Sequence, residues 1–133
     1  MKVLPEPSLV WRYMLALTQI PRGSNMGDEL WRHIKVRDFL KAEAEKLGCE
    51  TYVDKGENLI VRKAAYPGCE NKPVVCLQCH MDMVVQKDDD VEIDLGKDPL
   101  TPRIVDGKYL MATGTSLGAD DGAGVATGFA ILA

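Results

Sequence analysis

The sequence predicts an α/β fold in which a sheet is flanked by helices, and three features of the chain support this prediction. Residues 74–77 form an apolar, partly β-branched run that is typical of a buried strand. Apolar side chains recur with helical period between Leu30 and Leu47, and charged side chains fill the other positions. Glycine-containing turns at 54–57 and at 106–107 lie between alternating apolar and polar residues, which indicates two hairpins.

Composition limits the classes of function that the chain can have. Its 133 residues, 46% hydrophobic and 27% charged, are ordinary for one globular domain. The net charge of −4 argues against nucleic acid and anionic membranes as partners. No apolar run approaches the roughly twenty residues that span a bilayer, and the first residues lack the apolar core of a signal peptide. We therefore expect a cytoplasmic protein.

The predicted elements, in chain order, are a buried helix at about 8–18, a helix from about 28 to 47, a hairpin at 49–62, the strand that begins at 73, a hairpin at 103–110 and a helix from 121 onward. Asp28 and Glu29 suit the start of the second helix, and Gly48 suits its end. The acidic residues 86–102 indicate a solvated loop or, alternatively, a rim that attracts cations to a neighbouring site. The last helix has no capping residue, so we expect a truncated chain.

His80 and Asp82 follow the apolar run and lie two residues apart. In an extended chain such residues project to the same face, so an imidazole and a carboxylate stand side by side where the strand ends. Ligand sites of open α/β sheets lie at the carboxyl ends of strands. A histidine binds zinc through one ring nitrogen, and a carboxylate on the other nitrogen fixes its orientation. The pair indicates a metal site, although a lone His-x-Asp also occurs by chance.

A second acidic pair, Asp120 and Asp121, lies between Gly118 and Gly122 at the start of the last predicted helix. Adjacent carboxylates repel each other, and glycines cost chain entropy. The arrangement makes sense if a cation offsets the charge and the backbone passes close to another group. The alternative is an ordinary helix start, with one aspartate as the cap and the other in the first turn.

The segment Cys76-Leu-Gln-Cys79-His80 matches the pattern of covalent haem attachment. The missing export signal argues against haem, and the position inside a β run argues against both haem and a thioredoxin-like redox pair, which would open a helix. A zinc site from these three residues would need a second cluster, and Cys49 and Cys69 stand alone. We interpret the cysteines as free thiols, and those of the motif as small buried hydrophobes.

Three stretches, at 77–84, 97–99 and 114–122, resemble a known family in their order and spacing. Together they resemble the N-terminal part of the co-catalytic zinc dipeptidases of the M20 peptidase clan. The bacterial aminoacyl-histidine dipeptidases (peptidase D, or carnosinase-like) are the most similar. Residues 20–24 and 56–62 fall where that family has similar segments, so the likeness covers nearly the whole chain. It implies a zinc-exopeptidase-like mixed sheet flanked by helices.

The resemblance implies a role for each matched residue. His80 would bind one zinc ion, Asp120 would bridge two, and Asp82 would be the catalytic carboxylate that orients His80. Asp121 would lie behind the ligands, after a peptide bond that is often cis in this clan. The implied reaction is hydrolysis of Xaa-His and related short peptides by water that two zinc ions, or other divalent metals, activate. The implied partner is a short peptide, and full-length relatives are expected to be homodimers.

Members of this family are several-fold longer than this chain. Their general-base glutamate, their remaining metal ligands and an inserted domain for dimerisation and substrate capping lie downstream of the matched region. We therefore expect residues 1–133 to be the N-terminal part of the catalytic domain, with at most two of the four ligands that zinc usually takes. Such a fragment would be inactive alone. The alternative is a non-catalytic binding remnant of the same fold.

Overall fold

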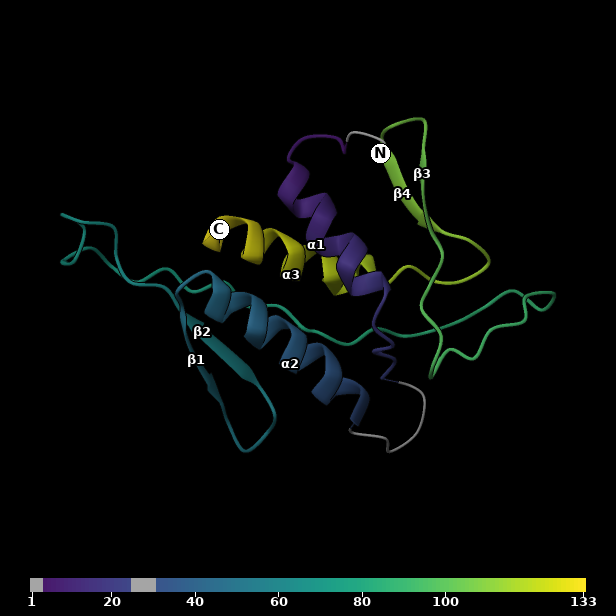
Figure 1. Ribbon diagram of the computed structural model, residues 1–133, viewed down its shortest axis with the longest axis horizontal. Coiled ribbons are helices and arrows are strands. Elements are labelled where there is room, and N and C mark those ends of the chain that lie inside the picture. Colours follow the sequence, from purple (N-terminus) through teal and green to yellow (C-terminus); the bar gives the residue numbers. More distant parts are fainter. Residues whose placement is uncertain (1–3, 25–30) are drawn as a thin grey trace.

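Three helices form the centre of the computed structural model, which describes residues 4–24 and 31–133. They are α1 (Ser8–Thr18), α2 (Trp31–Lys46) and α3 (Ala119–Leu132). Figure 1 shows α1 and α3 crossing next to each other, with α2 beside them. The rings of Tyr13 on α1 and Phe129 on α3 lie 5.4 Å apart between centroids and are tilted by 54°. The helices therefore supply the packed part of the molecule.

The buried side chains gather where the three helices meet. They are Tyr13, Met14, Leu17, Val36, Leu40, Ala44, Cys49, Val125, Ala126 and Phe129. The α3 sequence is rich in alanine and glycine, so its backbone can approach α1 closely. Ala126 is fully buried at this contact, and a Cβ at Gly122 would lie 3.1 Å from the sulfur of Met14. Small residues on α3 thus set the distance between the two helices.

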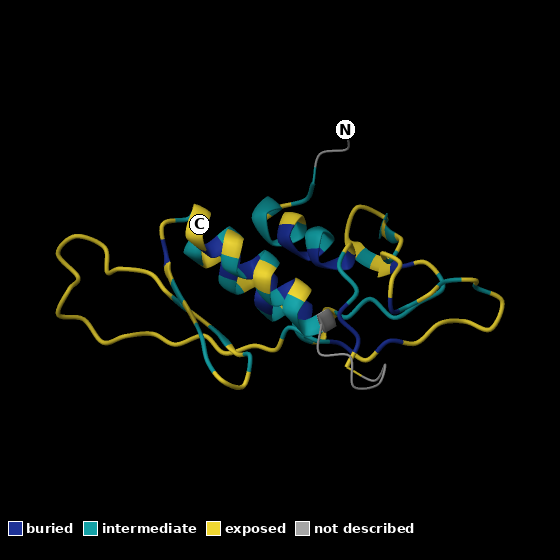
Figure 2. Cartoon of the chain, turned by 60° about the horizontal axis from the view of Figure 1, so that its bottom comes forward, coloured by how far each residue is buried: buried dark blue, intermediate teal, exposed yellow. Residues whose placement is uncertain are grey.

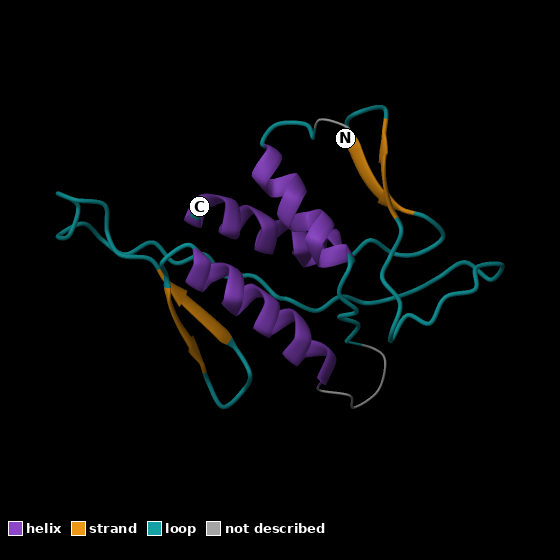
Figure 3. Ribbon diagram, viewed as in Figure 1, coloured by secondary structure: helices purple, strands orange, loops and turns teal. Residues whose placement is uncertain are grey.

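Two separate antiparallel hairpins flank the helices, and both were predicted from the sequence (Figure 3). In the first, β1 (Glu50–Val53) pairs with β2 (Leu59–Arg62). In the second, β3 (Pro102–Val105) pairs with β4 (Tyr109–Ala112). The turn of the second hairpin has positive φ at Asp106 (52°) and Gly107 (66°), as a tight Asp-Gly turn requires. These strands and helices confirm the predicted α/β class.

The predicted helices are confirmed, with differences at their ends. The first helix has the predicted bounds, and the second ends where Gly48 adopts a left-handed φ of 73°. The predicted start of the second helix at Asp28 and Glu29 lies outside the described residues. The last helix begins at Ala119, earlier than predicted, with non-helical backbone angles at the two aspartates that follow. Within the described residues, no helix is long and apolar enough to cross a membrane.

The predicted burial of the apolar run 74–77 is wrong for this chain. Val74 and Val75 are 94% and 81% exposed, and the segment runs extended along the molecule (Figures 1 and 2). A central strand is buried only when neighbouring strands pair with it and other elements cover its faces. Within residues 4–24 and 31–133 no strand pairs with this run. Further along, Met83 forms a parallel bridge with Gly23 and is buried.

Candidate metal site

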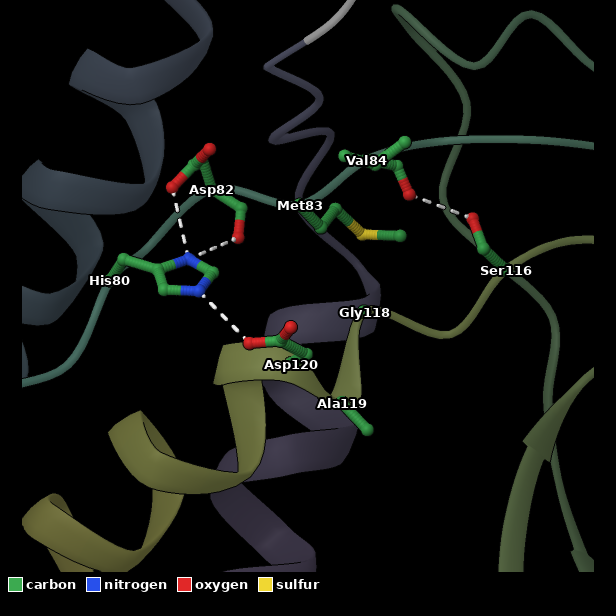
Figure 4. A pocket seen from close by; sticks show the side chains of 8 residues that line it. All are labelled: His80, Asp82, Met83, Val84, Ser116, Gly118, Ala119 and Asp120. Atoms are coloured by element: carbon green, nitrogen blue, oxygen red, sulfur yellow. Dashed lines mark hydrogen bonds and ion pairs between the residues drawn. The ribbon is translucent and has the colours of Figure 1, made fainter.

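A pocket of about 310 Å³ opens where the end of the extended segment meets the start of α3. Figure 4 shows the residues that line it. They are His80, Asp82, Met83, Val84, Ser116, Gly118, Ala119 and Asp120. The two polar stretches that the sequence singled out thus come together in space, although forty residues separate them. None of the acidic residues between 86 and 102 lines this pocket, which gives no support to the cation-attracting rim.

Backbone and side-chain hydrogen bonds fix the segment that carries the pocket. The amide of Met83 donates to the carbonyl of Arg22 (3.0 Å), and the amide of Ser24 donates to the carbonyl of Met83 (2.9 Å). On the other side, the Ser116 hydroxyl donates to the carbonyl of Val84 (3.1 Å). The Ser116 amide donates to the carbonyl of Gln86 (3.0 Å). The segment after His80 is therefore held from both sides.

The imidazole of His80 lies between two carboxylates (Figure 4). Its Nδ1 is 3.2 Å from the backbone carbonyl oxygen of Asp82 and 3.1 Å from Oδ1 of the same residue. Its Nε2 is 3.0 Å from Oδ1 of Asp120. A carbonyl oxygen can only accept, so Nδ1 carries the hydrogen in both contacts. In a neutral imidazole Nε2 would then present its lone pair to the Asp120 carboxylate.

Two acceptors facing each other at this distance repel unless a proton or a cation lies between them. Accordingly, the hydrogen bond to Asp120 raises the pKa of His80 above its ordinary value of 6.5, and interactions with Asp82 add to this effect. A metal ion can take the place of that proton. Two ligands of a tetrahedral zinc ion with bonds of 2.0–2.1 Å lie about 3.3 Å apart, so Nε2 of His80 and Oδ1 of Asp120 suit neighbouring coordination positions.

The carboxyl group of Asp82 is ionised at neutral pH. Burial alone would raise its pKa, but hydrogen bonds from Ser24, from its own backbone amide and from His80 outweigh burial. The pKa therefore lies below its ordinary value of 3.8. An anionic Asp82 on Nδ1 keeps the hydrogen on that nitrogen and leaves Nε2 free for the Asp120 side. Asp82 thus has the geometry of an orienting group for the imidazole.

The two adjacent aspartates have different surroundings. The side chain of Asp120 is 97% exposed and faces His80 across the pocket (Figure 4). Oδ1 of Asp121 accepts the amide hydrogen of Gly124 at 3.1 Å and so caps the regular part of α3. The bond between the two residues is cis, as the family resemblance implied. The capping alternative therefore holds for Asp121, whereas Asp120 has the geometry of a ligand.

The described residues bring together one histidine and one carboxylate that can face a metal ion. No group of three or more His, Cys, Asp or Glu side chains is arranged to hold a metal between 4 and 24 or between 31 and 133. The prediction that Cys76 and Cys79 are buried is wrong, because both are exposed free thiols on the unpaired part of the segment. Desolvation and the Asp121 carboxylate raise the pKa of the Cys79 thiol, which disfavours a reactive thiolate.

Sequence reasoning missed Arg22. It is 1% exposed and donates to the backbone carbonyls of Met81, Asp82 and Gly118, on both sides of the pocket. Burial holds the pKa of the guanidinium below its ordinary value, and the charge of Asp82 opposes that effect. The available signal was its place within residues 20–24, which the resemblance had already singled out. The charge alone gave no indication of burial, since most arginines are exposed.

Comparison with known proteins identifies a class of relatives: the chain is homologous to part of known dipeptidases. It is 37% identical to the cytosol non-specific dipeptidase of Escherichia coli (strain K12) over 128 residues. That match covers 96% of this chain and 25% of the relative. No protein-family model matches the sequence. The resemblance that the sequence motifs predicted is thereby confirmed.

A solved structure supports the same relationship. The crystal structure of aminoacylhistidine dipeptidase from Vibrio alginolyticus matches the fold with a TM-score of 0.82 and 37% sequence identity. The match covers 96% of this chain and 25% of that chain. The α/β arrangement of helices and hairpins is therefore that of part of a dipeptidase. The chain spans about a quarter of the length of both relatives.

Proposed function

We propose that the chain supplies part of the active site of a dinuclear zinc dipeptidase of the M20 family. In this proposal His80 binds one zinc ion, Asp120 bridges both ions, and Asp82 orients His80. The observation that carries the proposal is the position of Nε2 of His80, which faces the Asp120 carboxylate at 3.0 Å while Nδ1 contacts Asp82. A divalent cation satisfies both acceptors. The relatives, one named as cytosolic, support dipeptide hydrolysis in the cytosol.

Zinc, when bound, polarises a peptide carbonyl and lowers the pKa of a bound water. The residues of this chain have simpler tasks in the proposal. Asp82 keeps the hydrogen on Nδ1 of His80 and holds the ring in place. Asp121 fixes the first turn of α3, so that the Asp120 side chain extends into the pocket. The substrates we propose are Xaa-His dipeptides and related short peptides. The further ligands that zinc needs would come from residues that do not line this pocket.

Zinc binding tests the ligand assignment directly. We expect the purified chain to bind Zn²⁺ weakly, and to release protons on binding because the ion displaces the one on Nε2. Calorimetry at pH 7 in two buffers of different ionisation enthalpy measures both the affinity and the proton release. His80→Ala and Asp120→Ala are expected to abolish the binding. The control is His33→Ala on α2, which leaves the pocket intact, and an equal loss in this control contradicts the assignment.

Hydrolysis tests the proposed division of the active site. We expect the 133-residue chain alone to show no robust hydrolysis of a β-alanyl-histidine dipeptide in the presence of zinc, because its described residues bring only two ligands together. In a longer polypeptide that contains this chain and hydrolyses dipeptides, Asp82→Ala and Asp120→Ala are each expected to remove nearly all activity. Robust zinc-dependent turnover by the chain alone would refute the proposal that this chain supplies only part of the active site. Normal turnover by either variant would refute the assigned role.

A further inference from the structure

Arg22 links the two segments that form the pocket. We propose that it is a positioning residue: its buried guanidinium sets the separation between the segment of His80 and Asp82 and the turn that bears Asp120. The inference deepens the proposed function and rests on it, because the separation matters only if the two sides share a ligand. Arg22 itself does not line the pocket.

The hydrogen bonds of the guanidinium divide between the two sides. Nη1 donates to the carbonyls of Met81 (2.9 Å) and Asp82 (3.2 Å), which belong to the His80 segment. Nη2 donates to the carbonyl of Gly118 (2.8 Å), which immediately precedes α3. The guanidinium is planar and rigid, so the distance between its two terminal nitrogens is fixed. The two segments are therefore held at a separation that one side chain determines.

The backbone of Arg22 is fixed by the same segment that its side chain contacts. Its carbonyl accepts the amide hydrogen of Met83 at 3.0 Å, within the parallel bridge between Gly23 and Met83. The side chain is also almost completely buried, at 1% exposure. The two terminal nitrogens of this buried cation donate to backbone oxygens, which would lose these donors if the guanidinium moved. The Arg22 contacts therefore have one stable arrangement.

The glycines on either side of Asp120 leave the space that the guanidinium occupies. A Cβ on Gly118 would lie 2.7 Å from Nη2 of Arg22 and 2.4 Å from the sulfur of Met83. A Cβ on Gly122 would also lie 2.7 Å from Nη2. The sequence indicated that the backbone here passes close to another group. For these two glycines that group includes Arg22, which reaches the aspartate turn from the side of the core.

The consequence concerns the distance of 3.0 Å between Nε2 of His80 and Oδ1 of Asp120. Without the guanidinium, the two segments would be joined mainly by the contacts of Ser116 and by the bridge between Lys87 and Thr115. The hydrogen bond between Ser116 and Val84 lies in the pocket lining, but away from His80 (Figure 4). A lysine at position 22 would keep the charge but has one nitrogen, so it cannot reach both segments in the same fixed geometry. The segment that bears His80 and the turn that bears Asp120 would then move independently of each other.

Amide hydrogen exchange measures this link without any metal. We compare the wild type with Arg22→Lys and Arg22→Met, and with Arg12→Met as a control at an exposed arginine on α1. Exchange at the amides of Ser24, Met83 and Gly122 is expected to accelerate at least tenfold in both Arg22 variants. Exchange in β1 and β2 is expected to stay unchanged. If Arg22→Met does not fold, Arg22→Lys decides the test. Unchanged exchange at all three amides overturns the inference.

Zinc affinity of the same proteins shows whether the link matters to the site. We expect Zn²⁺ to bind at least fivefold more weakly to Arg22→Lys than to the wild type. Val36→Ala serves as a control, because it creates a cavity at a buried position of α2 and so lowers stability away from the pocket. We expect this variant to keep the wild-type affinity for Zn²⁺. Equal affinity in Arg22→Lys and the wild type, or equal loss in Val36→Ala, overturns the inference. Failure of the wild type to bind Zn²⁺ counts against the proposed function, and exchange alone then decides whether Arg22 holds the segments.

Discussion

The extended segment that runs past the three helices has an exposed first half and a second half in which buried side chains alternate with exposed ones. In the first half, Val74 and Val75 are 94% and 81% exposed. In the second half, Met83 and Val85 are 2% and 6% exposed. The second half pairs with Gly23, whereas the first half pairs with no strand in the described part of the chain. Apolar character alone therefore does not bury a strand, because burial also needs neighbouring elements that pair with it and cover it.

The candidate site lies at the boundary between these halves. His80 ends the exposed half, and Asp82 precedes the buried Met83. The buried half gives Asp82 a fixed position, and the open half leaves the imidazole 48% exposed. A site that must hold a metal ion and admit a substrate needs both properties.

Truncating one apolar side chain in each half is the most direct test of the contrast. Met83→Ala is expected to lower the free energy of unfolding by about 2–5 kcal/mol, the usual cost of removing a buried methionine side chain. Val75→Ala is expected to change it by no more than about 0.5 kcal/mol, as for other surface positions. Urea unfolding of both variants measures the two values. Equal losses would show that the two halves do not differ in the way described.

A substitution at Asp82 tests whether this carboxylate orients the imidazole of His80. Asp82→Ala removes the carboxylate on Nδ1 of His80, and loss of such a partner typically lowers metal affinity about 10–100-fold. We expect a zinc titration of this variant to show a decrease within that range. Asp88→Ala, in the exposed acidic loop, is the matched control because it removes a carboxylate that does not line the pocket. A decrease of the same size in the control would mean that overall charge explains the effect.

The pH dependence of stability tests the pair formed by His80 and Asp120. The pKa of His80 is raised above 6.5 in the folded protein, so its contribution is fully present below about pH 6.5 and is lost as the pH rises through the raised pKa. The effect is expected to be less than about 1 kcal/mol, because His80 is largely exposed. Unfolding of the wild type and of His80→Gln at pH 5.5 and pH 8.5 measures it. The stability advantage of the wild type should be larger at pH 5.5, and the opposite trend would contradict the pairing.

A charged side chain in the exposed half is expected to change the association between chains with little change in stability. Its apolar side chains and unpaired backbone groups form an open strand edge, and such edges favour association between chains. Val74→Lys is expected to reduce concentration-dependent association while leaving the free energy of unfolding within about 0.5 kcal/mol of the wild type. Sedimentation at several protein concentrations measures the first quantity. Association that persists unchanged would mean that another surface is responsible.

Local patterns predicted the elements that form through local contacts. The helical period predicted α2, and the Asp-Gly turn predicted the hairpin of β3 and β4, because both depend on residues close in sequence. The exposure of Val74 could not be predicted in this way, since the burial of a strand depends on neighbouring strands that lie far away in the sequence. The same limit applies to Arg22: its burial results from carbonyls that lie 59 and 96 residues away along the chain.

The candidate site was predicted in its residue types and only partly in its geometry. The motifs identified His80, Asp82 and Asp120, and the structure brings all three to one pocket. The sequence left two interpretations of the aspartate pair open, and the structure assigns capping to Asp121 through the amide of Gly124. That division depends on backbone angles at the start of α3, which neither composition nor spacing determines.

In the proposed metal site, Nε2 of His80, with Nδ1 held by Asp82, faces a cation shared with Asp120. The chain has only two histidines, so their ring nitrogens can be followed separately by NMR during a titration with Zn²⁺. We predict that Zn²⁺ shifts the Nε2 resonance of His80, that its Nδ1 stays protonated, and that His33 does not respond. Binding through Nδ1, or an unchanged His80 at millimolar Zn²⁺, would contradict the account.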